Sequence, residues 1–377
     1  MKYMGSKRTM LLNGLGEAIA ETAPSHRRFV DLFTGSGVVA WHVAQKYDVE
    51  VLAGDLQQFC VVLASSVISR TKPLDGRWLE DWIAAAEAEL RASSILVDAK
   101  RIQEILCDAD IERVAKRARK LCQTPSAPIF NAYGGYYFSP LQAMSLDALR
   151  TTLPRQREVQ PVALASLIWV ASRCAASPGH TAQPFKPNKT AGKYLKEAWS
   201  RDVCGSLRQA YAAISPLYSR RKGQAKKSDA SDLAAKMKDG DLAFIDPPYS
   251  GVHYSRFYHV LETIVTHEQV PVSGEGRYPP RELRPQSDYS VQTASCDAIT
   301  ELLKVLSLVG SSAILTFPAG EASNGLSGRI VKDIAGQFFR IKSTKITSRF
   351  STLGGNLRNR DARQSSDELI LTLTPRG

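Results

Sequence analysis

Residues 28–37 read RFVDLFTGSG, an apolar run that reaches an aspartate and continues into a turn with two glycines. The run predicts a buried strand over Arg28–Phe33, and the apolar spacing after the glycines predicts a helix over Val38–Lys46. A second apolar run predicts a strand over Glu50–Gly54, which ends at Asp55. A strand, a helix and a strand in this order predict a β-α-β unit with parallel strands.

The glycine turn of this unit predicts a site for a nucleoside. Gly35 and Gly37 let a ligand approach the backbone, and Asp55 is placed to receive ribose hydroxyls. Asp31, two residues before Phe33, would repel a pyrophosphate but attract an ammonium or a sulfonium. We therefore expect a nucleoside with a cationic amino-acid tail rather than NAD. The alternative is a turn in which glycine serves only the backbone conformation.

Further apolar runs continue this pattern beyond the middle of the chain. They predict strands over Leu242–Ile245, Ser312–Phe317, Phe338–Ile346 and Glu368–Thr374. Helices between them predict an α/β fold with a doubly wound, Rossmann-like sheet, mostly parallel with an antiparallel last strand. Residues 348–366 lack apolar periodicity and predict a mobile loop.

The middle of the chain predicts a helical insertion into this fold. Helical spacing extends over Arg77–Arg91, Asp98–Leu121, Pro161–Ala176 and Tyr194–Ile214. The run Ser219–Ser228 predicts a basic linker. We therefore expect a catalytic domain made of residues 1–70 and 228–377, interrupted by an inserted basic region at residues 71–227.

The positive charge is concentrated in the same middle region. The 377 residues include 49 Lys and Arg and 37 Asp and Glu, a net charge of +12. Residues 100–232 hold 22 of these basic residues and 10 of the acidic ones, so the rest of the chain is neutral. A basic segment on a neutral scaffold indicates a polyanionic partner, with nucleic acid the leading candidate. A solvated helix surface, an acidic protein or an anionic membrane surface would give the same count.

Composition excludes several classes of protein. The apolar runs are far shorter than the roughly 20 residues of a membrane span, and no signal-peptide core follows the basic N-terminus. We therefore expect a cytoplasmic protein without membrane contact. The six cysteines include no C-x-x-C pair, which argues against a disulfide framework and against a metal site.

A second motif, Asp246-Pro247-Pro248-Tyr249, follows the predicted strand Leu242–Ile245. Two successive prolines cannot continue a strand ladder, so they predict a rigid turn at the carboxyl end of the sheet, where open α/β sheets bind ligands. Asp246 and the Pro247 carbonyl are placed to accept both N–H bonds of an exocyclic amine, while Tyr249 stacks on the base.

Three sequence blocks, in this order, resemble the DNA adenine methylase family, the Dam-like amino-methyltransferases. They are Tyr3-Met4-Gly5-Ser6-Lys7, Asp31–Gly37 and Asp246–Tyr249. The resemblance covers roughly residues 1–70 and 228–377. It implies transfer of a methyl group from S-adenosylmethionine to the N6 amine of adenine in a specific DNA sequence, by base flipping and direct in-line transfer. Asp246, Pro247, Pro248 and Tyr249 would be the catalytic residues.

The resemblance also implies how the cofactor is held. Asp31 would lie near its ammonium and Asp55 near its ribose, and an acidic residue before the second motif would contact its adenine. Asp232 and Asp229 both fit this last position. The full set of implied cofactor-binding residues is Tyr3, Met4, Gly5, Lys7, Asp31, Phe33, Gly35, Gly37, Asp55 and Asp232.

In that family the middle of the chain holds target-recognition elements, so DNA is the expected partner. The residues predicted to bind it are Lys186, Lys189, Lys193, Arg220, Arg221, Lys226, Lys227, Tyr254 and Arg256. The last two belong to the run His253–His259, for whose other residues a packed amphipathic helix is the favoured alternative. A cognate restriction enzyme is a further candidate partner, and we expect a monomer rather than an obligate oligomer.

Four other functions stay open at this point. Methylation of cytosine at N4 also requires hydrogen bonds to an exocyclic amine, although Asp246 favours adenine. RNA is an alternative substrate to DNA. A non-catalytic DNA-binding relative would have lost Asp246 or Tyr249, and both are present. An NAD-dependent oxidoreductase would explain the glycine turn but has no use for the proline turn.

Overall fold

The computed structural model describes residues 7–351 and 363–376, and the chain divides into two compact units. The sheet unit comprises the described part of residues 5–72, 217–254 and 285–377. The helical unit comprises residues 73–216 and 255–284. Compared with the predicted insertion at 71–227, residues 217–227 group with the sheet and Ser255–Arg284 groups with the helices.

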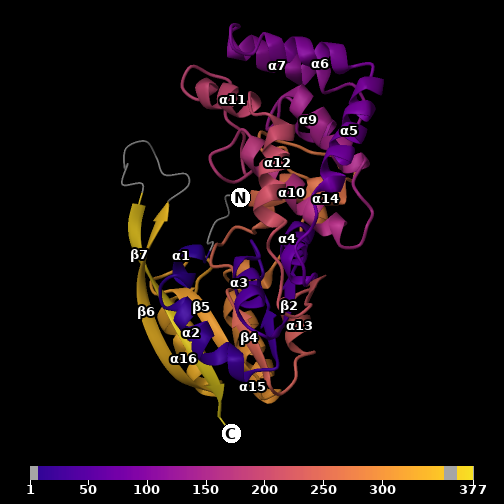
Figure 1. The fold of residues 1–377 in the computed structure, drawn as a ribbon. Helices are drawn as coiled ribbons and strands as arrows, with labels where there is room; N and C mark the ends of the chain where they lie inside the picture. The colour runs from indigo at the N-terminus through magenta and orange to yellow at the C-terminus, as the bar shows by residue number, and fades with distance from the viewer. Residues whose placement is uncertain (1–6, 352–362, 377) are drawn as a thin grey trace. The chain divides into compact units, whose positions relative to one another are not determined.

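The sheet unit contains a seven-stranded sheet in the order β3-β2-β1-β4-β5-β7-β6 (Figure 1). Pairing is parallel from β3 to β5, whereas β7 runs antiparallel to both β5 and β6. The predicted α/β class with a mostly parallel sheet is confirmed. The strands are β1 (Arg28–Asp31), β2 (Glu50–Asp55), β3 (Gln224–Lys227), β4 (Asp241–Ile245), β5 (Ser312–Pro318), β6 (Phe339–Ser351) and β7 (Arg363–Pro375).

Helices cover both faces of this sheet because its central strands are apolar on both sides. Phe29 and Val30 are neighbours on β1 and point to opposite faces, so they belong to two separate apolar cores. The helices over the core around Phe29 are α2 (Leu15–Thr22), α3 (Val38–Lys46) and α4 (Gln58–Ile68). Those over the core around Val30 are α13 (Ala230–Ala234), α15 (Ser295–Leu308) and α16 (Gly328–Phe338). The unit also holds α1 (Arg8–Leu11) and the 3₁₀ turns Ala23–Ser25 and Asp288–Ser290.

Two segments of the sheet unit differ from the sequence-based prediction. Gln224–Lys227 was predicted within a linker but forms the edge strand β3, which pairs with Leu52–Asp55. Its sequence is short and lysine-rich, so its extended structure comes from pairing with β2 rather than from its own pattern. Strands β6 and β7 extend into the stretch 348–366 that was predicted as a loop, and residues 352–362 lie outside the described residues.

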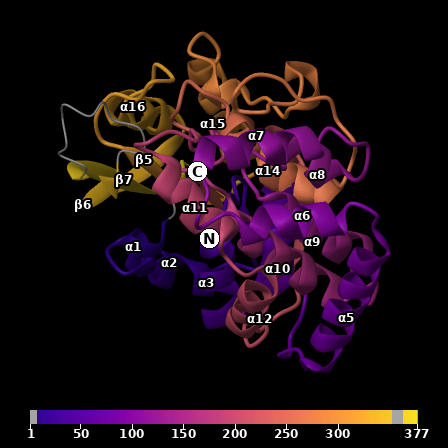
Figure 2. The same cartoon turned by 90° about the horizontal axis from the view of Figure 1, so that it is seen from above.

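In the helical unit an apolar core forms among α6, α7 and α11, and α10 lies along α12 (Figure 2). Two helices predicted as continuous are each broken in two, because Asp110 and Asp202 start new helices by capping them with their side chains. The helices are α5 (Arg77–Ala92), α6 (Leu96–Glu104), α7 (Ile111–Leu121), α8 (Pro128–Tyr133), α9 (Pro140–Thr151), α10 (Val159–Cys174), α11 (Gly192–Trp199), α12 (Val203–Ile214) and α14 (Ser255–Thr266), with a 3₁₀ turn at Arg281–Leu283.

Candidate active site

The carboxyl ends of β1 and β4 lie side by side at the centre of the sheet. The two strands are parallel neighbours, and the strand order turns away from them in opposite directions. Loops diverge at such a switch point and leave a crevice for ligands. Asp31 ends β1 and Asp246 directly follows β4, so the two predicted motifs lie close together at this switch point.

The glycine turn after β1 has a left-handed backbone conformation that favours glycine. Gly35 and Gly37 have φ angles of 51° and 76°, and Gly37 begins α3. Asp55 holds the turn in place, because its Oδ2 accepts the Gly35 N–H at 2.8 Å and its Oδ1 accepts the Gln57 N–H at 2.9 Å. A ribose hydroxyl at this position would donate to an Asp55 oxygen that already accepts a backbone N–H.

Asp31 carries a carboxylate oxygen without a hydrogen-bond partner in the described chain. The residue is 1% exposed; its Oδ1 accepts the Phe33 N–H at 3.3 Å, and its Oδ2 is buried and unpaired. Burial, and then the charge of Asp246, raises the pKa of Asp31 well above its usual value. A cation relieves an unpaired buried carboxylate, so this position suits an ammonium or sulfonium ligand.

Asp246 belongs to a buried charge cluster made of Lys7, Asp246, Thr316 and Glu368. Lys7 Nζ lies 3.0 Å from Asp246 Oδ1 and 3.1 Å from Glu368 Oε2. Thr316 donates to the same Asp246 Oδ1 at 2.8 Å. Burial lowers the pKa of Lys7, but the two carboxylates outweigh burial and hold that pKa above its ordinary value. Lys7 therefore stays charged.

The proline turn after β4 is clamped by the segment between β5 and α16. The buried Asn324 donates from Nδ2 to the Pro248 carbonyl at 3.0 Å and to the Tyr289 carbonyl at 2.9 Å. The Gly251 N–H donates to Ser323 Oγ at 2.9 Å. Within the described residues the Pro247 carbonyl accepts no hydrogen bond, so it is available to a ligand.

Phe33 and Tyr289 form an aromatic wall beside the glycine turn. Their rings meet edge to face with centroids 4.9 Å apart. The Tyr289 hydroxyl lies 3.3 Å from Ser231 Oγ, and Asp229 accepts the Ser231 N–H at 2.8 Å. Burial raises the pKa of Tyr289, and the Asp229 charge adds to this effect. The Asp229 charge thus acts on Tyr289, whereas Asp232 is exposed.

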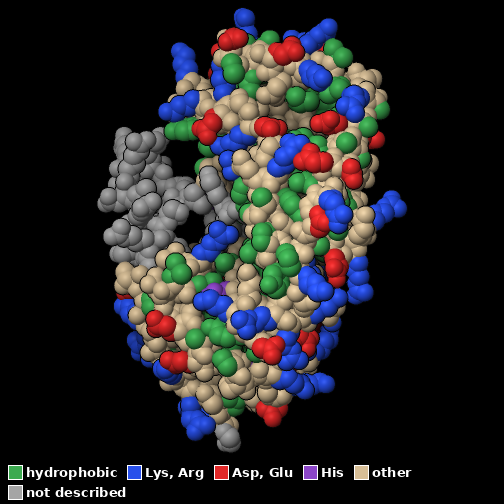
Figure 3. All heavy atoms as spheres, viewed as in Figure 1, with side chains coloured by type: hydrophobic (Ala, Val, Ile, Leu, Met, Phe, Trp, Pro, Cys, Tyr) green, Lys and Arg blue, Asp and Glu red, His purple; other side chains and the backbone are tan. Residues whose placement is uncertain are grey.

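In the helical unit, the residues predicted to bind DNA lie at the surface. Lys189, Lys193 and Arg256 are exposed, and Lys186 pairs with Glu275 at 3.4 Å. Lys and Arg side chains project from the visible face of this unit and are intermixed with Asp and Glu (Figure 3). The basic excess of the sequence therefore does not form one continuous patch on that face.

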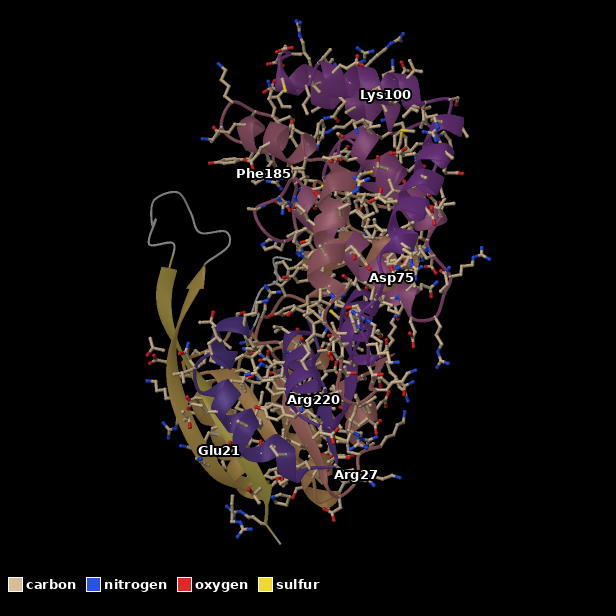
Figure 4. All side chains as sticks on the ribbon, in the orientation of Figure 1. Glu21, Arg27, Asp75, Lys100, Phe185 and Arg220 are labelled. Atoms are coloured by element: carbon tan, nitrogen blue, oxygen red, sulfur yellow. The ribbon has the colours of Figure 1, made fainter. Side chains whose placement is uncertain are left out.

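The predicted residues of the sheet unit lie at two different edges. Lys226 and Lys227 are exposed, and Lys227 lies opposite Asp55 in the register of β2 and β3, at the carboxyl edge that carries the site. Arg220 (labelled in Figure 4) instead donates from Nε to the Gln45 carbonyl at 3.2 Å, in the last turn of α3, at the opposite end of that helix from Gly37. Arg220 and its neighbour Arg221 therefore lie near the amino edge. Tyr254 is half-buried and hydrogen-bonds the Tyr249 side chain.

A cleft of about 630 Å³ opens in the helical unit between the end of α10, the loop that follows and α11. Trp169, Phe185 and Tyr194 line it, together with Arg173 and Arg201 (Phe185 is labelled in Figure 4). The Arg173 guanidinium lies 5.4 Å from the Trp169 ring centroid, and the Phe185 and Tyr194 ring centroids are 5.4 Å apart. Aromatic faces beside guanidinium groups suit nucleotides.

Sequence reasoning missed the residues that support the site, namely Thr316, Asn324 and Glu368, and the aromatic Tyr289. Tyr3, Met4 and Gly5 lie outside the described residues. No group of three or more metal-binding side chains occurs within residues 7–351 and 363–376. None of the helices described there combines the length and hydropathy that a bilayer crossing needs.

A family model for D12 class N6 adenine-specific DNA methyltransferases matches residues 3–305. The chain belongs to this family, whose members are enzymes that methylate adenine in DNA.

Individual relatives agree with the family. The chain is 27% identical over 281 residues to "Type II methyltransferase M.FokI" of Planomicrobium okeanokoites, an alignment that covers 73% of the chain and 38% of the relative. It is 23% identical over 308 residues to "Modification methylase StsI" of Streptococcus sanguinis, covering 81% of the chain and 42% of that relative. "Modification methylase LlaI" of Lactococcus lactis subsp. lactis is 23% identical over 304 residues, with 77% and 42% covered. The chain thus spans about two fifths of the length of these curated relatives.

Proposed function

We propose that this chain transfers a methyl group from S-adenosylmethionine to the N6 amine of adenine in a specific DNA sequence. The observation that carries the proposal is the proximity of two carboxyl groups at the ends of neighbouring strands. Within the described residues, Asp31 has a buried oxygen without a partner, and Asp246 has one oxygen bound by Lys7 and Thr316 while the other accepts no hydrogen bond. The first suits a cationic donor and the second suits an amine.

The residues of the crevice fit S-adenosylmethionine. Its ammonium would bind near Asp31, its ribose near Asp55 with Gly35 and Gly37, and its adenine against Phe33 and Tyr289. We assign the adenine contact to Asp229 rather than Asp232, because the Asp229 charge acts on Tyr289 and Asp229 binds the backbone of Ser231, whose side chain lies next to the Tyr289 hydroxyl. When bound, the cofactor supplies an electrophilic methyl group on a sulfonium sulfur. We assign Lys7 to Asp246 rather than to the cofactor, because its charge would repel a sulfonium.

Asp246 and Pro247 prepare the target amine. The lone pair of an exocyclic amine is delocalised into the base, so the nitrogen is a weak nucleophile. Hydrogen bonds from its two N–H groups to Asp246 Oδ2 and the Pro247 carbonyl localise that pair and stabilise the positive charge that develops on nitrogen. Pro248 keeps the turn rigid, and Tyr249 stacks on the base, which must leave the duplex to enter the crevice.

We further propose that the exposed cations of both units bind DNA phosphates. In the helical unit these are Lys189, Lys193 and Arg256, and the aromatic cleft next to α11 contacts a nucleotide. In the sheet unit Lys226 and Lys227 lie at the edge that carries the site. We leave Arg220 and Arg221 out of this surface because they lie near the opposite edge.

The relatives that are named modification methylases suggest a restriction enzyme that cuts the same DNA sequence as a partner. Purified protein incubated with labelled S-adenosylmethionine and DNA, followed by sequencing of modified bases, tests the whole proposal. N6-methyladenine within one sequence is the expected product, and Asp246→Ala is the matched inactive control. Methylated cytosine or RNA would point to the alternative substrates, and stabilisation by NAD alone would refute the proposal.

A further inference from the structure

Glu368 is a buried carboxylate whose position needs an explanation. It lies on β7 opposite Pro318 of β5, inside the sheet, and its side chain is 0% exposed. It also lies outside residues 3–305, the part of the chain that the family model matches. Withdrawing a carboxylate from water is unfavourable unless a partner compensates. Among the described residues Lys7 is that partner, at 3.1 Å from Oε2, while Oε1 has none.

Glu368 determines where the Lys7 ammonium sits. Lysine ends in a point charge on a flexible stem, so one ion pair alone does not fix its direction. Lys7 is held between two anions, Glu368 Oε2 at 3.1 Å and Asp246 Oδ1 at 3.0 Å. A second anion behind the ammonium therefore restricts Lys7 to one oxygen of Asp246.

This restriction makes the two oxygens of Asp246 unequal. Lys7 and Thr316 both donate to Oδ1, and no donor in the described chain reaches Oδ2. Oδ2 is thus left to accept a hydrogen bond from a ligand. The charges also matter, because one ammonium and two carboxylates leave the cluster with an excess negative charge where the target amine becomes positive.

We propose that Glu368 is a positioning residue for methyl transfer, which holds Lys7 against Oδ1 of Asp246 and so presents Oδ2 to the target amine. This inference rests on the proposed adenine methylation. It predicts that Glu368 acts on the rate of transfer and not on the binding of S-adenosylmethionine or DNA.

The test is a double-mutant cycle on the full chain. Glu368→Gln keeps the size of the side chain and removes its charge. We expect the single-turnover rate of methyl transfer to fall about 10- to 100-fold. Removing a residue that only orients a metal ligand has an effect of this size, and Glu368 acts on Asp246 in the same indirect way, through Lys7. The Kd for S-adenosylmethionine and for DNA should change by less than about twofold. In a Lys7→Met background the same Glu368→Gln change should alter the rate by less than about twofold, because Glu368 acts through Lys7.

Asp367→Asn is the matched control. Asp367 is the preceding residue of β7 and pairs at 2.6 Å with Lys345, away from the cluster. Its loss should leave the rate unchanged. If Glu368→Gln does not fold, the pair Lys7→Met and Glu368→Leu replaces the ion pair by apolar groups, and it should fold and transfer as slowly as Lys7→Met alone.

The outcomes separate the two proposals. A wild-type chain that does not methylate adenine refutes the proposed function. An active wild type with a fully active Glu368→Gln variant refutes only the role of Glu368. An equal rate loss in both Lys7 backgrounds also refutes it, because Glu368 would then act independently of Lys7.

Discussion

Replacing Asp246 by asparagine tests how Lys7 and Thr316 orient the carboxylate that we propose to be catalytic. Lys7 and Thr316 both donate to Oδ1, at 3.0 and 2.8 Å. Only the oxygen of an amide accepts hydrogen bonds, so the asparagine oxygen will take the Oδ1 position and its NH2 group the Oδ2 position. A donor then faces the N–H groups of the target amine, which are donors as well.

The expected loss of activity follows from this geometry. Removing one well-aimed group that stabilises developing charge costs about 2.7–4 kcal/mol, or roughly 10²- to 10³-fold in kcat. In Asp246→Asn the asparagine NH2 group also faces the N–H groups of the target amine, and this repulsion between donors adds to the loss of kcat. We therefore expect kcat of Asp246→Asn to fall at least as far as kcat of Asp246→Ala, in which water can fill the empty place. Folding should be little affected, because Lys7 keeps Glu368 at 3.1 Å.

The assay is single-turnover transfer of labelled methyl groups to DNA, with calorimetry for S-adenosylmethionine binding and a Tm measurement. Both variants should bind the cofactor, because Asp31 is intact. Asp239→Asn, at an exposed residue before β4, should transfer at the normal rate. If the Asp246→Asn variant were tenfold faster than Asp246→Ala, the amide oxygen would have to face the amine, and the assigned orientation would be wrong.

Four more changes probe the rest of the chain. Asp31→Asn should weaken S-adenosylmethionine binding. In the wild type this affinity should fall as pH drops, starting at a higher pH than for an ordinary aspartate because the pKa of Asp31 is raised, and the variant should lose this pH dependence in calorimetry. Asn324→Ala removes the donor from a buried and a part-buried carbonyl, so we expect about 1–3 kcal/mol less stability in urea and slower transfer with normal cofactor affinity. Tyr194→Ala should raise the Kd for DNA about tenfold if a base stacks there, and an unchanged Kd would remove the cleft from the DNA surface. Lys189→Gln with Lys193→Gln should reduce the slope of log affinity against log salt by about two, whereas an unchanged slope would place the phosphate contacts elsewhere.

Local signals allowed much of the sheet unit to be predicted. The helix Val38–Lys46 and the turn at Gly35 and Gly37 depend on apolar spacing and on the backbone freedom of glycine, which neighbouring residues reveal. The sequence also carries a signal for the breaks before α7 and α12, because Asp110 and Asp202 are typical N-cap residues, but the prediction did not use it. Continuous helices were predicted there because the apolar spacing resumes after each cap.

Other features depend on partners far away in the chain. Strand β3 has no strand pattern of its own and is extended because it pairs with β2. Glu368 looks like a polar residue at the start of an apolar strand, and its partner Lys7 is 361 residues away. Thr316 and Asn324 gain their roles only when β5 and the segment after it lie beside the proline turn. Spacing along a single sequence carries no signal for such contacts.

The contact between Lys7 and Glu368 joins residues that are synthesised 361 positions apart. A ribosome that has completed β5 has already delivered Asp31, the glycine turn and Asp246, but not the carboxylate that holds Lys7. The ion pair is therefore complete only when β7 enters the sheet between β5 and β6. A chain that stops before β7 would lack the anion that holds Lys7 against Asp246.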